Sequence, residues 1–385
     1  KDPYVPIGSI KLLVLNVDTS INYQTIQAAI DDATAGDTIN VAAGTYDEQV
    51  VIGKSLTLQG TGDDTVIQPS GAEVLTTVKP APWITWGGTP LPDKPMAAIV
   101  FVDAPNGFVV VKDLKIDGTQ ILTVPVDIPA VQWVAGLAYL ETSGSVERLT
   151  VIGNPNIGCR AAGIWASAMV TSSQVAVTQC DVIGYNRAGI YALGAQLIAD
   201  YNYNEINGPG ESYEGSQVPN GIFFLRGAKG SASYNTVTDL SYTGGQYRST
   251  GIGTYNAGLD ITFTYNDISF VQNAFALSNG TSGTIVEYND IFNNHTGVRL
   301  ESGATNSVIR YNDIHDNDFA IRCESAAVVA YMAGMGPGNV AHYNNFVSNP
   351  GLAWENEEGS PKATFTYEGA VCNLHETNKL DATYN

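Results

Sequence analysis

A Tyr-Asn dipeptide recurs through the second half of this 385-residue chain, and its spacing constrains the fold more than any other feature. The steps between successive asparagines are 31, 31, 23, 23 and 32 residues. We interpret the short step as one bare repeat and the longer steps as the same repeat with an inserted loop. Repeats of this length indicate a stacked, solenoid-like architecture. The pairs are Tyr203-Asn204, Tyr234-Asn235, Tyr265-Asn266, Tyr288-Asn289, Tyr311-Asn312 and Tyr343-Asn344.

Each repeat contains short segments in which apolar and polar residues alternate, such as SVIR, NDIH and FAIRCE within residues 307–324. Alternation with a period of two is typical of half-buried strands. Three short strands in each repeat predict an all-β, single-stranded parallel β-helix, in which coils stack at the strand spacing of about 4.8 Å.

The asparagine of each pair is predicted to have a structural role at one corner of the coil. We expect it to adopt the left-handed conformation that a tight turn needs. We also expect its side chain to point inward and bond the equivalent asparagines of neighbouring coils, while the preceding tyrosine points outward.

The N-terminal region predicts a cap for the first coil. Ile26, Ala29, Ile30 and Ala33 fall on one helical face, so a helix over 20–35 would cover the open end of the solenoid. We therefore predict one domain over 1–385. Its coils span 36–350, with inserted loops at about 76–98, 207–219 and 241–250, and the last coil and a truncated tail occupy 351–385.

The segment TIQAAIDDATAGDTINVAAGTYDEQVVIGKSLTLQG (25–60) resembles the opening of right-handed parallel β-helix proteins of the pectin-lyase-like superfamily. The resemblance covers about residues 20–350. It implies a right-handed coil and a polysaccharide-degrading or cell-surface protein. The final DATYN resembles the start of a longer element that follows such repeats in surface proteins, so we expect the natural chain to continue. The repeats also resemble archaeal disaggregatase-like enzymes, which degrade matrix polysaccharide.

The strand after the corner can be aligned from coil to coil, and two columns of its side chains should face outward. One end of these columns is aromatic: Trp165, Tyr191, Phe223 and Tyr255. Aromatic faces stack on sugar rings, so we expect these residues to bind a saccharide. The alternative is that they pack beneath the inserted loops.

The other end of the columns carries Arg299 and Arg322 beside Glu301 and Glu324. Neighbouring coils should place the two carboxylates roughly 5 Å apart, so Glu301 and Glu324 are the predicted catalytic acid and base. The two arginines are predicted to bind an acidic substrate. A salt-bridge ladder without catalytic function is the structural alternative.

Inserted loops should form a wall beside this face, and exposed loops on a regular scaffold often carry function. From these loops we predict Glu214, Tyr247 and Arg248 as substrate contacts. His295 and His315 precede the Arg-Glu segments, so either is a candidate general acid or base, with a surface role as the alternative.

No metal ligand or cofactor is assigned. Calcium remains an alternative for the outward Asp267, Asp290 and Asp313, against solvated turn residues. The four cysteines fit no zinc spacing, so we expect buried thiols, with a disulfide left open.

Composition excludes two classes of partner. The net charge is −20, which is unsuited to a nucleic-acid surface. No apolar run is long enough to span a membrane. We predict an extracellular or cell-surface protein, either a monomer or a homotrimer, with a polysaccharide partner.

Three functions stay open. A glycoside hydrolase using paired carboxylates, on an acidic or amino-sugar-containing polysaccharide, comes first. A polysaccharide lyase acting by β-elimination on a uronate polymer comes second. It would have to use Arg, His or Tyr, because Lys229 is the only lysine between 116 and 361. A non-catalytic carbohydrate-binding or adhesion module comes third.

Overall fold

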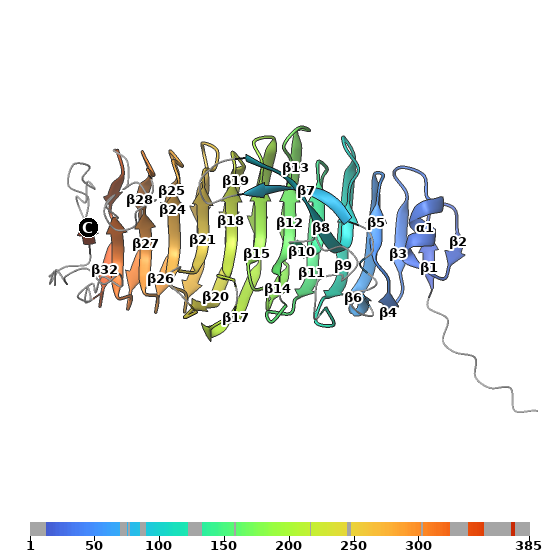
Figure 1. The fold of residues 1–385 in the computed structure, drawn as a ribbon, viewed down its shortest axis with the longest axis horizontal. Helices are drawn as coiled ribbons and strands as arrows, with labels where there is room; N and C mark the ends of the chain where they lie inside the picture. Colours follow the sequence, from blue (N-terminus) through green and yellow to red (C-terminus); the bar gives the residue numbers. More distant parts are fainter. Residues whose placement is uncertain are drawn as a thin grey trace, which may run out of the picture.

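The computed structural model describes residues 13–69, 75, 78–84, 90–121, 133–157, 159–215, 217–244, 248–301, 303–323, 338–349 and 371–373. These residues form an elongated stack of β-coils, with the single described helix, α1, at one end (Figure 1). No helix among them is long and apolar enough to cross a membrane.

The N-terminal part contains the cap and the first, longer strands. Its elements are β1 (Val14–Asn16), β2 (Ile21–Tyr23), α1 (Ile26–Asp32), β3 (Thr38–Val41), β4 (Gly44–Asp47), β5 (Val50–Ile52), β6 (Leu56–Gln68), β7 (Val78–Ile84), β8 (Pro90–Val102), β9 (Phe108–Asp117), β10 (Trp133–Leu140) and β11 (Ser143–Ile152).

Later coils carry up to three strands each. The strands before the Tyr-Asn corner are β13 (Ser173–Thr178), β16 (Leu197–Asn202), β19 (Lys229–Ser233), β22 (Thr262–Thr264), β25 (Ile285–Glu287), β28 (Val308–Arg310) and β31 (Val340–His342). Those after it are β14 (Asp181–Ile183), β17 (Glu205–Tyr213), β20 (Thr236–Tyr242), β23 (Asp267–Ser269), β26 (Asp290–Phe292), β29 (Asp313–His315) and β32 (Asn345–Val347).

The third strand of each coil joins a separate sheet, which we call the site sheet because it carries the predicted site residues. From the N-terminal end its parallel strands are β5, β8, β10, β12 (Arg160–Ser167), β15 (Ala188–Leu193), β18 (Asn220–Leu225), β21 (Thr250–Tyr255), β24 (Asn273–Ser278), β27 (Thr296–Leu300), β30 (Phe319–Cys323) and β33 (Val371–Asn373), and β7 pairs antiparallel with β8.

Each coil strand pairs in parallel with the equivalent strands of the coils on either side. For example, β28 pairs with β25 through Ile309 and Val286, and β29 pairs with β26 through Ile314 and Ile291. Together, the site-sheet pairing and these registers confirm the predicted all-β, parallel β-helix.

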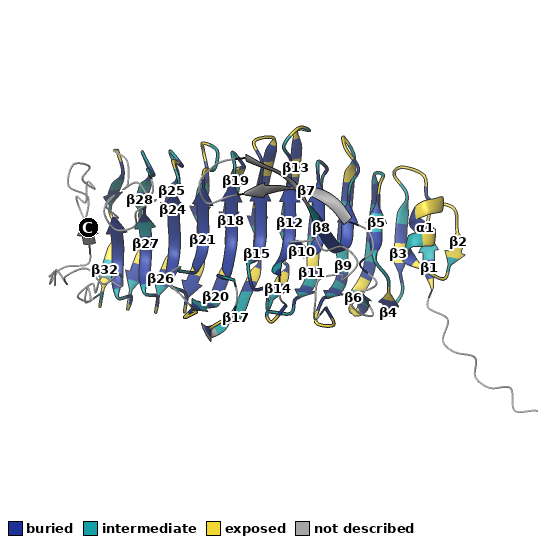
Figure 2. Ribbon diagram, in the orientation of Figure 1, coloured by how far each residue is buried: buried dark blue, intermediate teal, exposed yellow. Residues whose placement is uncertain are grey.

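The solenoid is held together by an apolar interior, and buried residues follow its strands along the stack (Figure 2). In one coil, Ile309, Ile314 and Ile321 are fully buried, and each lies beside an equivalent apolar residue of the preceding coil. Burial of a side chain of this size contributes about 1.5–3 kcal/mol. The hydrophobic period of two therefore fixes which face of every strand points inward.

The asparagine side chains form the predicted inward ladder. The Nδ2 of Asn289 donates to Oδ1 of Asn312 at 2.9 Å, and its own Oδ1 accepts from Nδ2 of Asn266 at 2.9 Å. The same link joins Asn204 to Asn235 and Asn312 to Asn344. A buried polar column of this kind is stable because the amides satisfy one another.

The predicted backbone conformation at this corner was wrong. The left-handed residue is the tyrosine, with φ between 55° and 59° at all six positions, whereas none of the ladder asparagines has a positive φ. The asparagine must turn inward to bond its neighbours, so the preceding residue makes the turn. In three earlier coils, Asp113, Arg148 and Gln179 take this position, also with positive φ.

The cap helix is shorter than the predicted 20–35. It begins after Thr25, whose hydroxyl accepts from the N–H of Ala28, and it ends at Asp32, followed by extended Ala33. Ile26, Ala29 and Ile30 are buried against the first coil, as the helical pattern predicts. Residues 19–24 instead lie in a turn and in strand β2.

Candidate functional site

The aromatic column on the outer face of the site sheet is buried. Trp165 is 1% exposed, Tyr191 4% and Phe223 7%. Their rings pack edge to face, at 5.4 Å between Trp165 and Tyr191 and 6.4 Å between Tyr191 and Phe223. Stacking on a sugar requires an exposed ring face, which these residues do not offer in this structure.

This burial has a source in the N-terminal coils. Phe101 of β8, Trp133 of β10 and Leu225 of β18 pack with the column into a second hydrophobic cluster outside the solenoid interior. The Trp133 ring lies 5.0 Å from that of Trp165. The alternative expectation, that the column packs rather than binds, agrees with this geometry.

Charged residues replace the aromatic ones toward the C-terminal end of the same face. Arg299 and Arg322 are paired in register on β27 and β30. Arg299 Nη2 lies 2.7 Å from Glu301 Oε2, and this pair is only slightly exposed. Glu324, the second predicted catalytic carboxylate, lies outside the described residues, so the Glu301–Glu324 pair remains a prediction.

Tyr255 lies two coils before Glu301 on the same sheet and is affected by its charge. Burial, with the negative charge of Glu301, raises the pKa of Tyr255 to about 12. The phenol therefore stays protonated at neutral pH and can donate a hydrogen bond or a proton. Glu301, Arg299 and Tyr255 form one cluster, at the end of β27.

A second cluster lies at the beginning of β27. His295 Nδ1 is 2.7 Å from Asp318 Oδ2, and the imidazole also packs edge to face on Phe319 at 5.5 Å. A carboxylate at this distance favours the tautomer with the proton on Nδ1, which leaves Nε2 as the basic nitrogen. Nε2 is itself buried and has no hydrogen-bond partner among the described residues.

Two arginines add positive charge around this histidine. Burial lowers the pKa of His295, and the charges of Arg248 and Arg322 lower it further, against the opposing effect of Asp318. The guanidinium of Arg322 also lies over the Phe319 ring, 5.8 Å from its centroid. The imidazole is therefore neutral near pH 7, which a general base requires.

Asp318 was missed by the sequence prediction, although a signal existed. His295 and Asp318 stand 23 residues apart, which is the length of one bare coil, so the repeat register aligns them. Two further polar atoms beside His295 were also missed. Thr296 Oγ1 and Asn273 Oδ1 are buried on adjacent strands and have no hydrogen-bond partner in the described part of the chain.

The two clusters are too far apart to act on one bond. His295 and Glu301 are six residues apart along β27, which corresponds to about 20 Å at 3.3 Å per residue. General acid–base groups must lie within hydrogen-bond reach of the atoms that react. The clusters can contact different units of one polymer, but each must be considered separately as a reaction centre.

The predicted loop residues have different places in the structure. Arg248 joins the His295 cluster electrostatically. Glu214 is exposed beyond the end of β17, and Tyr247 lies outside the described residues. The roles of Glu214 and Tyr247 in binding substrate remain predictions.

The acidic column beside the Tyr-Asn corner includes one group whose geometry suits a cation, formed by Asp290, Asp313 and His315. However, His315 already bonds Asp290 at 3.0 Å and Asp316 at 2.8 Å. These bonds raise the pKa of His315, since they favour its charged form. Asp290 and Asp316 therefore already have His315 as a hydrogen-bond partner.

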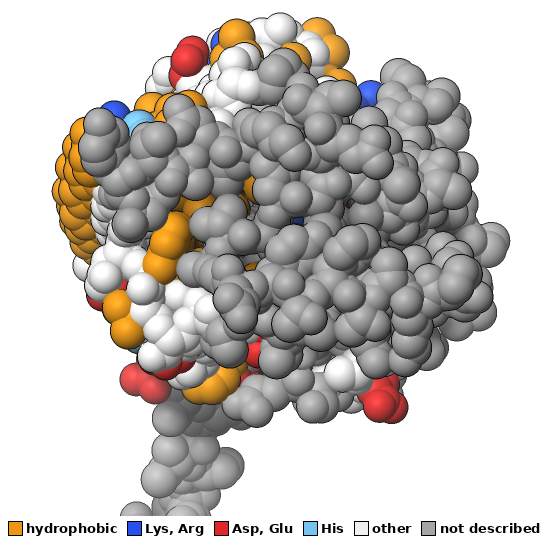
Figure 3. All heavy atoms as spheres, turned by 90° about the vertical axis from the view of Figure 1, so that its left-hand side faces the viewer, with side chains coloured by type: hydrophobic (Ala, Val, Ile, Leu, Met, Phe, Trp, Pro, Cys, Tyr) orange, Lys and Arg blue, Asp and Glu red, His pale blue; other side chains and the backbone are white. Residues whose placement is uncertain are grey.

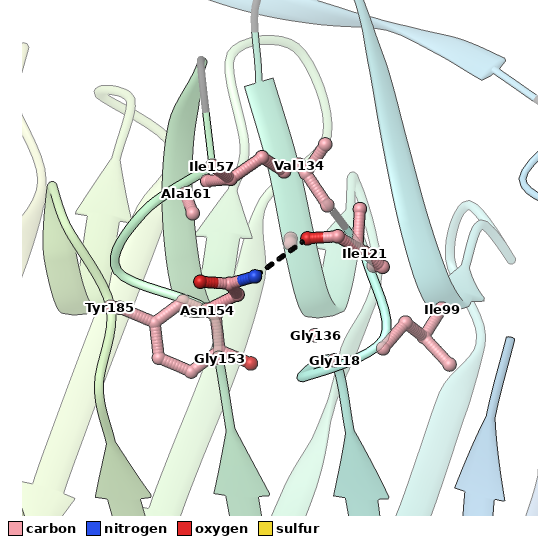
Figure 4. Close-up of a pocket in the computed structure, with 11 residues that line it drawn as sticks. Ile99, Gly118, Ile121, Val134, Gly136, Gly153, Asn154, Ile157, Ala161 and Tyr185 are labelled. Atoms are coloured by element: carbon pink, nitrogen blue, oxygen red, sulfur yellow. Dashed lines mark hydrogen bonds between the residues drawn. The ribbon is translucent and has the colours of Figure 1, made fainter. Parts of the chain in front are cut away.

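A pocket lies at the turn between β9, β10 and β11 (Figure 4). Its volume is about 10 Å³, and its lining is mostly glycine and aliphatic residues, with Asn154 donating to the carbonyl of Ile121 at 3.2 Å. Sites for small molecules usually measure about 300–1,000 Å³ and carry convergent polar groups. The pocket is therefore a packing defect rather than the saccharide site.

Comparisons with known proteins identify the fold. No family model matches the sequence, and no curated protein matches it. Among solved structures, the A-module of mannuronan C-5 epimerase AlgE4 from Azotobacter vinelandii is similar, with a TM-score of 0.54, 16% identity and coverage of 94% of each chain. The AlgE6 A-module from the same organism gives a TM-score of 0.51 at 16% identity, covering 93% of each chain.

A third similar structure is the GH136 lacto-N-biosidase from Eubacterium ramulus. It has a TM-score of 0.54 and 15% identity, covering 92% of this chain but 64% of the biosidase. At such identities the similarity shows architecture and not activity. The chain thus has a right-handed parallel β-helix fold, as its N-terminal segment and repeats predict.

Proposed function

We propose that this protein is an extracellular enzyme that cleaves an acidic polysaccharide by β-elimination, with His295 as the general base. The observation that carries the proposal is the His295–Asp318 pair at 2.7 Å beside the positive charges of Arg248 and Arg322. This reverses the order of the sequence predictions, in which hydrolysis came before elimination.

The chemistry follows from these groups. Nε2 of His295 is buried in this structure, so the reaction requires a movement that exposes it. Nε2 then takes the proton on the carbon beside a uronate carboxylate, and Asp318 stabilises the imidazolium that forms. Arg248 and Arg322 pair with the carboxylate, which makes that C–H more acidic. The electrons of the broken C–H bond form a C=C bond, the glycosidic C–O bond breaks, and the departing oxygen takes a proton from water.

Hydrolysis is the second candidate, because of one observation at the other cluster. Arg299 holds the Glu301 carboxylate at 2.7 Å, and the charge of this carboxylate raises the pKa of Tyr255, which stays protonated. A carboxylate and a proton donor are the minimum for acid–base cleavage of a glycoside. The third candidate, a carbohydrate-binding module, would need neither cluster to react.

The test is incubation with soluble polymers of uronates and of neutral sugars, followed by two readouts. β-Elimination produces new reducing ends together with the ultraviolet absorbance of an unsaturated uronate, whereas hydrolysis produces reducing ends alone. Binding of a polymer without its cleavage would support only the third candidate, a carbohydrate-binding module.

Variants then separate the clusters. His295→Gln keeps a group that can bond Asp318 but removes the base, so the elimination rate should fall by about 10²–10⁴. His342→Gln is the matched control, because His342 lies beside Tyr343 in β31, which belongs to the larger sheet and not to the site sheet. Elimination that survives His295→Gln but is lost in Glu301→Gln would reject our assignment.

A further inference from the structure

The six tyrosines of the Tyr-Asn pairs form a continuous stacked ladder on the outside of the solenoid. Successive ring centroids are 4.8, 4.9, 5.2, 5.1 and 5.4 Å apart from Tyr203 to Tyr343, and the ring planes differ by 5–11°. Figure 3 shows a row of exposed hydrophobic side chains along its left edge, one behind another down the solenoid.

The ladder is exposed to an unusual degree for aromatic residues. The tyrosines are 42–57% exposed, and together they form an apolar stripe that crosses six coils. A contiguous exposed stripe of this kind marks an interaction surface more often than an isolated exposed residue does. Because the ring faces stack on one another, the stripe presents ring edges and hydroxyl groups to a partner.

Charge beside the stripe indicates the sign of that partner. The residue directly after each asparagine is exposed and is acidic in four of the coils that carry the stripe: Glu205, Asp267, Asp290 and Asp313. Burial raises the pKa of Asp267, and the neighbouring charge of Asp290 raises it further, while Asp290 itself bonds His315 at 3.0 Å. On the opposite side of the stripe, the charge of Arg310 is matched by Glu287 at 2.6 Å.

The apolar stripe and the carboxylates beside it together suit a polymer that carries positive charge. Ring edges do not attract cations as ring faces do, so the carboxylates and not the rings would bind the charges. A second copy of this chain would bring a second acidic column and would be repelled. The repeat distance also excludes an extended basic peptide, whose same-face side chains are about 6.6–6.8 Å apart and out of step with the rungs.

We propose that the tyrosine stripe binds a linear polysaccharide of amino sugars with free amines, lying along the solenoid axis. One pyranose unit is about as long as one rung of the ladder. In a β-1,4-linked chain successive sugars face opposite ways, so every second sugar can place its C–H face on a tyrosine edge and its ammonium group near a carboxylate. This surface is separate from the clusters on the site sheet and does not depend on the activity proposed there.

The experiment is retention of the whole protein on three insoluble polymers: chitosan, which has free amines, chitin, whose amines are acetylated, and cellulose. We expect retention on chitosan alone, at low salt, and its loss as salt screens the charges. No retention on chitosan, or equal retention on cellulose, would overturn the proposal.

Two variants test the two components of the surface. Asp267→Asn/Asp290→Asn/Asp313→Asn removes three charges with little change of shape, and Tyr265→Asn/Tyr288→Asn removes two rings while suiting the left-handed backbone. Each should weaken chitosan binding at least tenfold. Circular dichroism verifies folding, and cleavage of acidic polymer should be unchanged.

The matched control is Asp31→Asn/Asp64→Asn/Asp260→Asn, which removes three exposed charges away from the stripe. It should bind chitosan as the unmodified protein does. Equal loss in the control would mean that net charge alone causes retention, and the proposal would then be rejected. Unchanged binding in both stripe variants would reject it as well.

Discussion

The asparagine ladder should be the most sensitive point of the scaffold, and Asn289→Ala tests it. Asn289 is 2% exposed. Its amide donates to Asn312 Oδ1, to the Phe263 carbonyl and to the Glu287 carbonyl, and it accepts from the backbone and side-chain nitrogens of Asn266. The substitution therefore removes five hydrogen bonds at once.

The magnitude follows from what each partner loses. The backbone N–H of Asn266 is buried and loses its acceptor, which costs about 1–3 kcal/mol. The other partners keep some alternative contact or lose an ordinary bond, at about 0.5–1.5 kcal/mol each. Allowing for overlap, we expect a loss of about 4 kcal/mol in the free energy of unfolding.

The assay combines guanidinium unfolding with hydrogen exchange, because a solenoid can open locally. Exchange should accelerate most in the peptides that cover residues 262–315. Asn345→Ala is the control, since Asn345 is exposed and makes one surface bond, to Asp313 at 2.9 Å. A loss in Asn289→Ala no larger than in Asn345→Ala would refute the role of the ladder.

Three further predictions concern the stripe, the histidines and the thiols. Tyr288→Asn relieves about 1 kcal/mol of left-handed backbone strain but loses two stacking contacts of about 0.5–1.5 kcal/mol each. Thermal unfolding should therefore show a net loss of stability below about 2 kcal/mol. A loss as large as in Asn289→Ala would contradict this balance. In an NMR titration, His295 should titrate below the ordinary value of 6.5 and His315 above it. His315 then contributes stability in acid, and this contribution is lost as the pH rises through the pKa of His315 in the folded protein. Neutral His295 contributes stability that is lost as the pH falls. The reverse order of titration would refute both environments. Burial raises the pKa of Cys159 and Cys180 to about 12, so peptide mapping should show both, with buried Cys323, unlabelled by a thiol reagent at pH 8 until the protein unfolds.

The repeat period made much of the scaffold predictable. Two fixed elements, an inward asparagine and an apolar residue two positions later, set the register of every later coil. Residues such as Ile291 and Ile314 therefore fall inside, as expected. The left-handed residue was assigned one position too late, because asparagine tolerates that conformation better than tyrosine does and the competing demand of the ladder was not weighed.

The outer face was harder to predict because its environment depends on distant segments. Trp165 and Tyr191 have the right positions for a binding platform, but Trp133 and Phe101 of earlier coils pack with them. The sequence period predicts on which face of the strand a side chain lies, but it does not predict which other residues cover that face. Charged positions such as Arg299 and Glu301 were placed correctly on the outer face, since coil register alone determines them.

The site and the scaffold share one geometric cause. His295–Asp318 and Arg310–Glu287 each join residues 23 positions apart, and Arg299 and Arg322 are paired across the same step. Two bare coils follow each other here, so a side chain at one offset meets the residue at the same offset in the next coil. Longer coils, with their inserted loops, precede this region and supply Arg248 from one side. A parallel solenoid can thus bring together a histidine, its carboxylate partner and a pair of arginines by repetition of position, while the asparagine ladder keeps the coils in register.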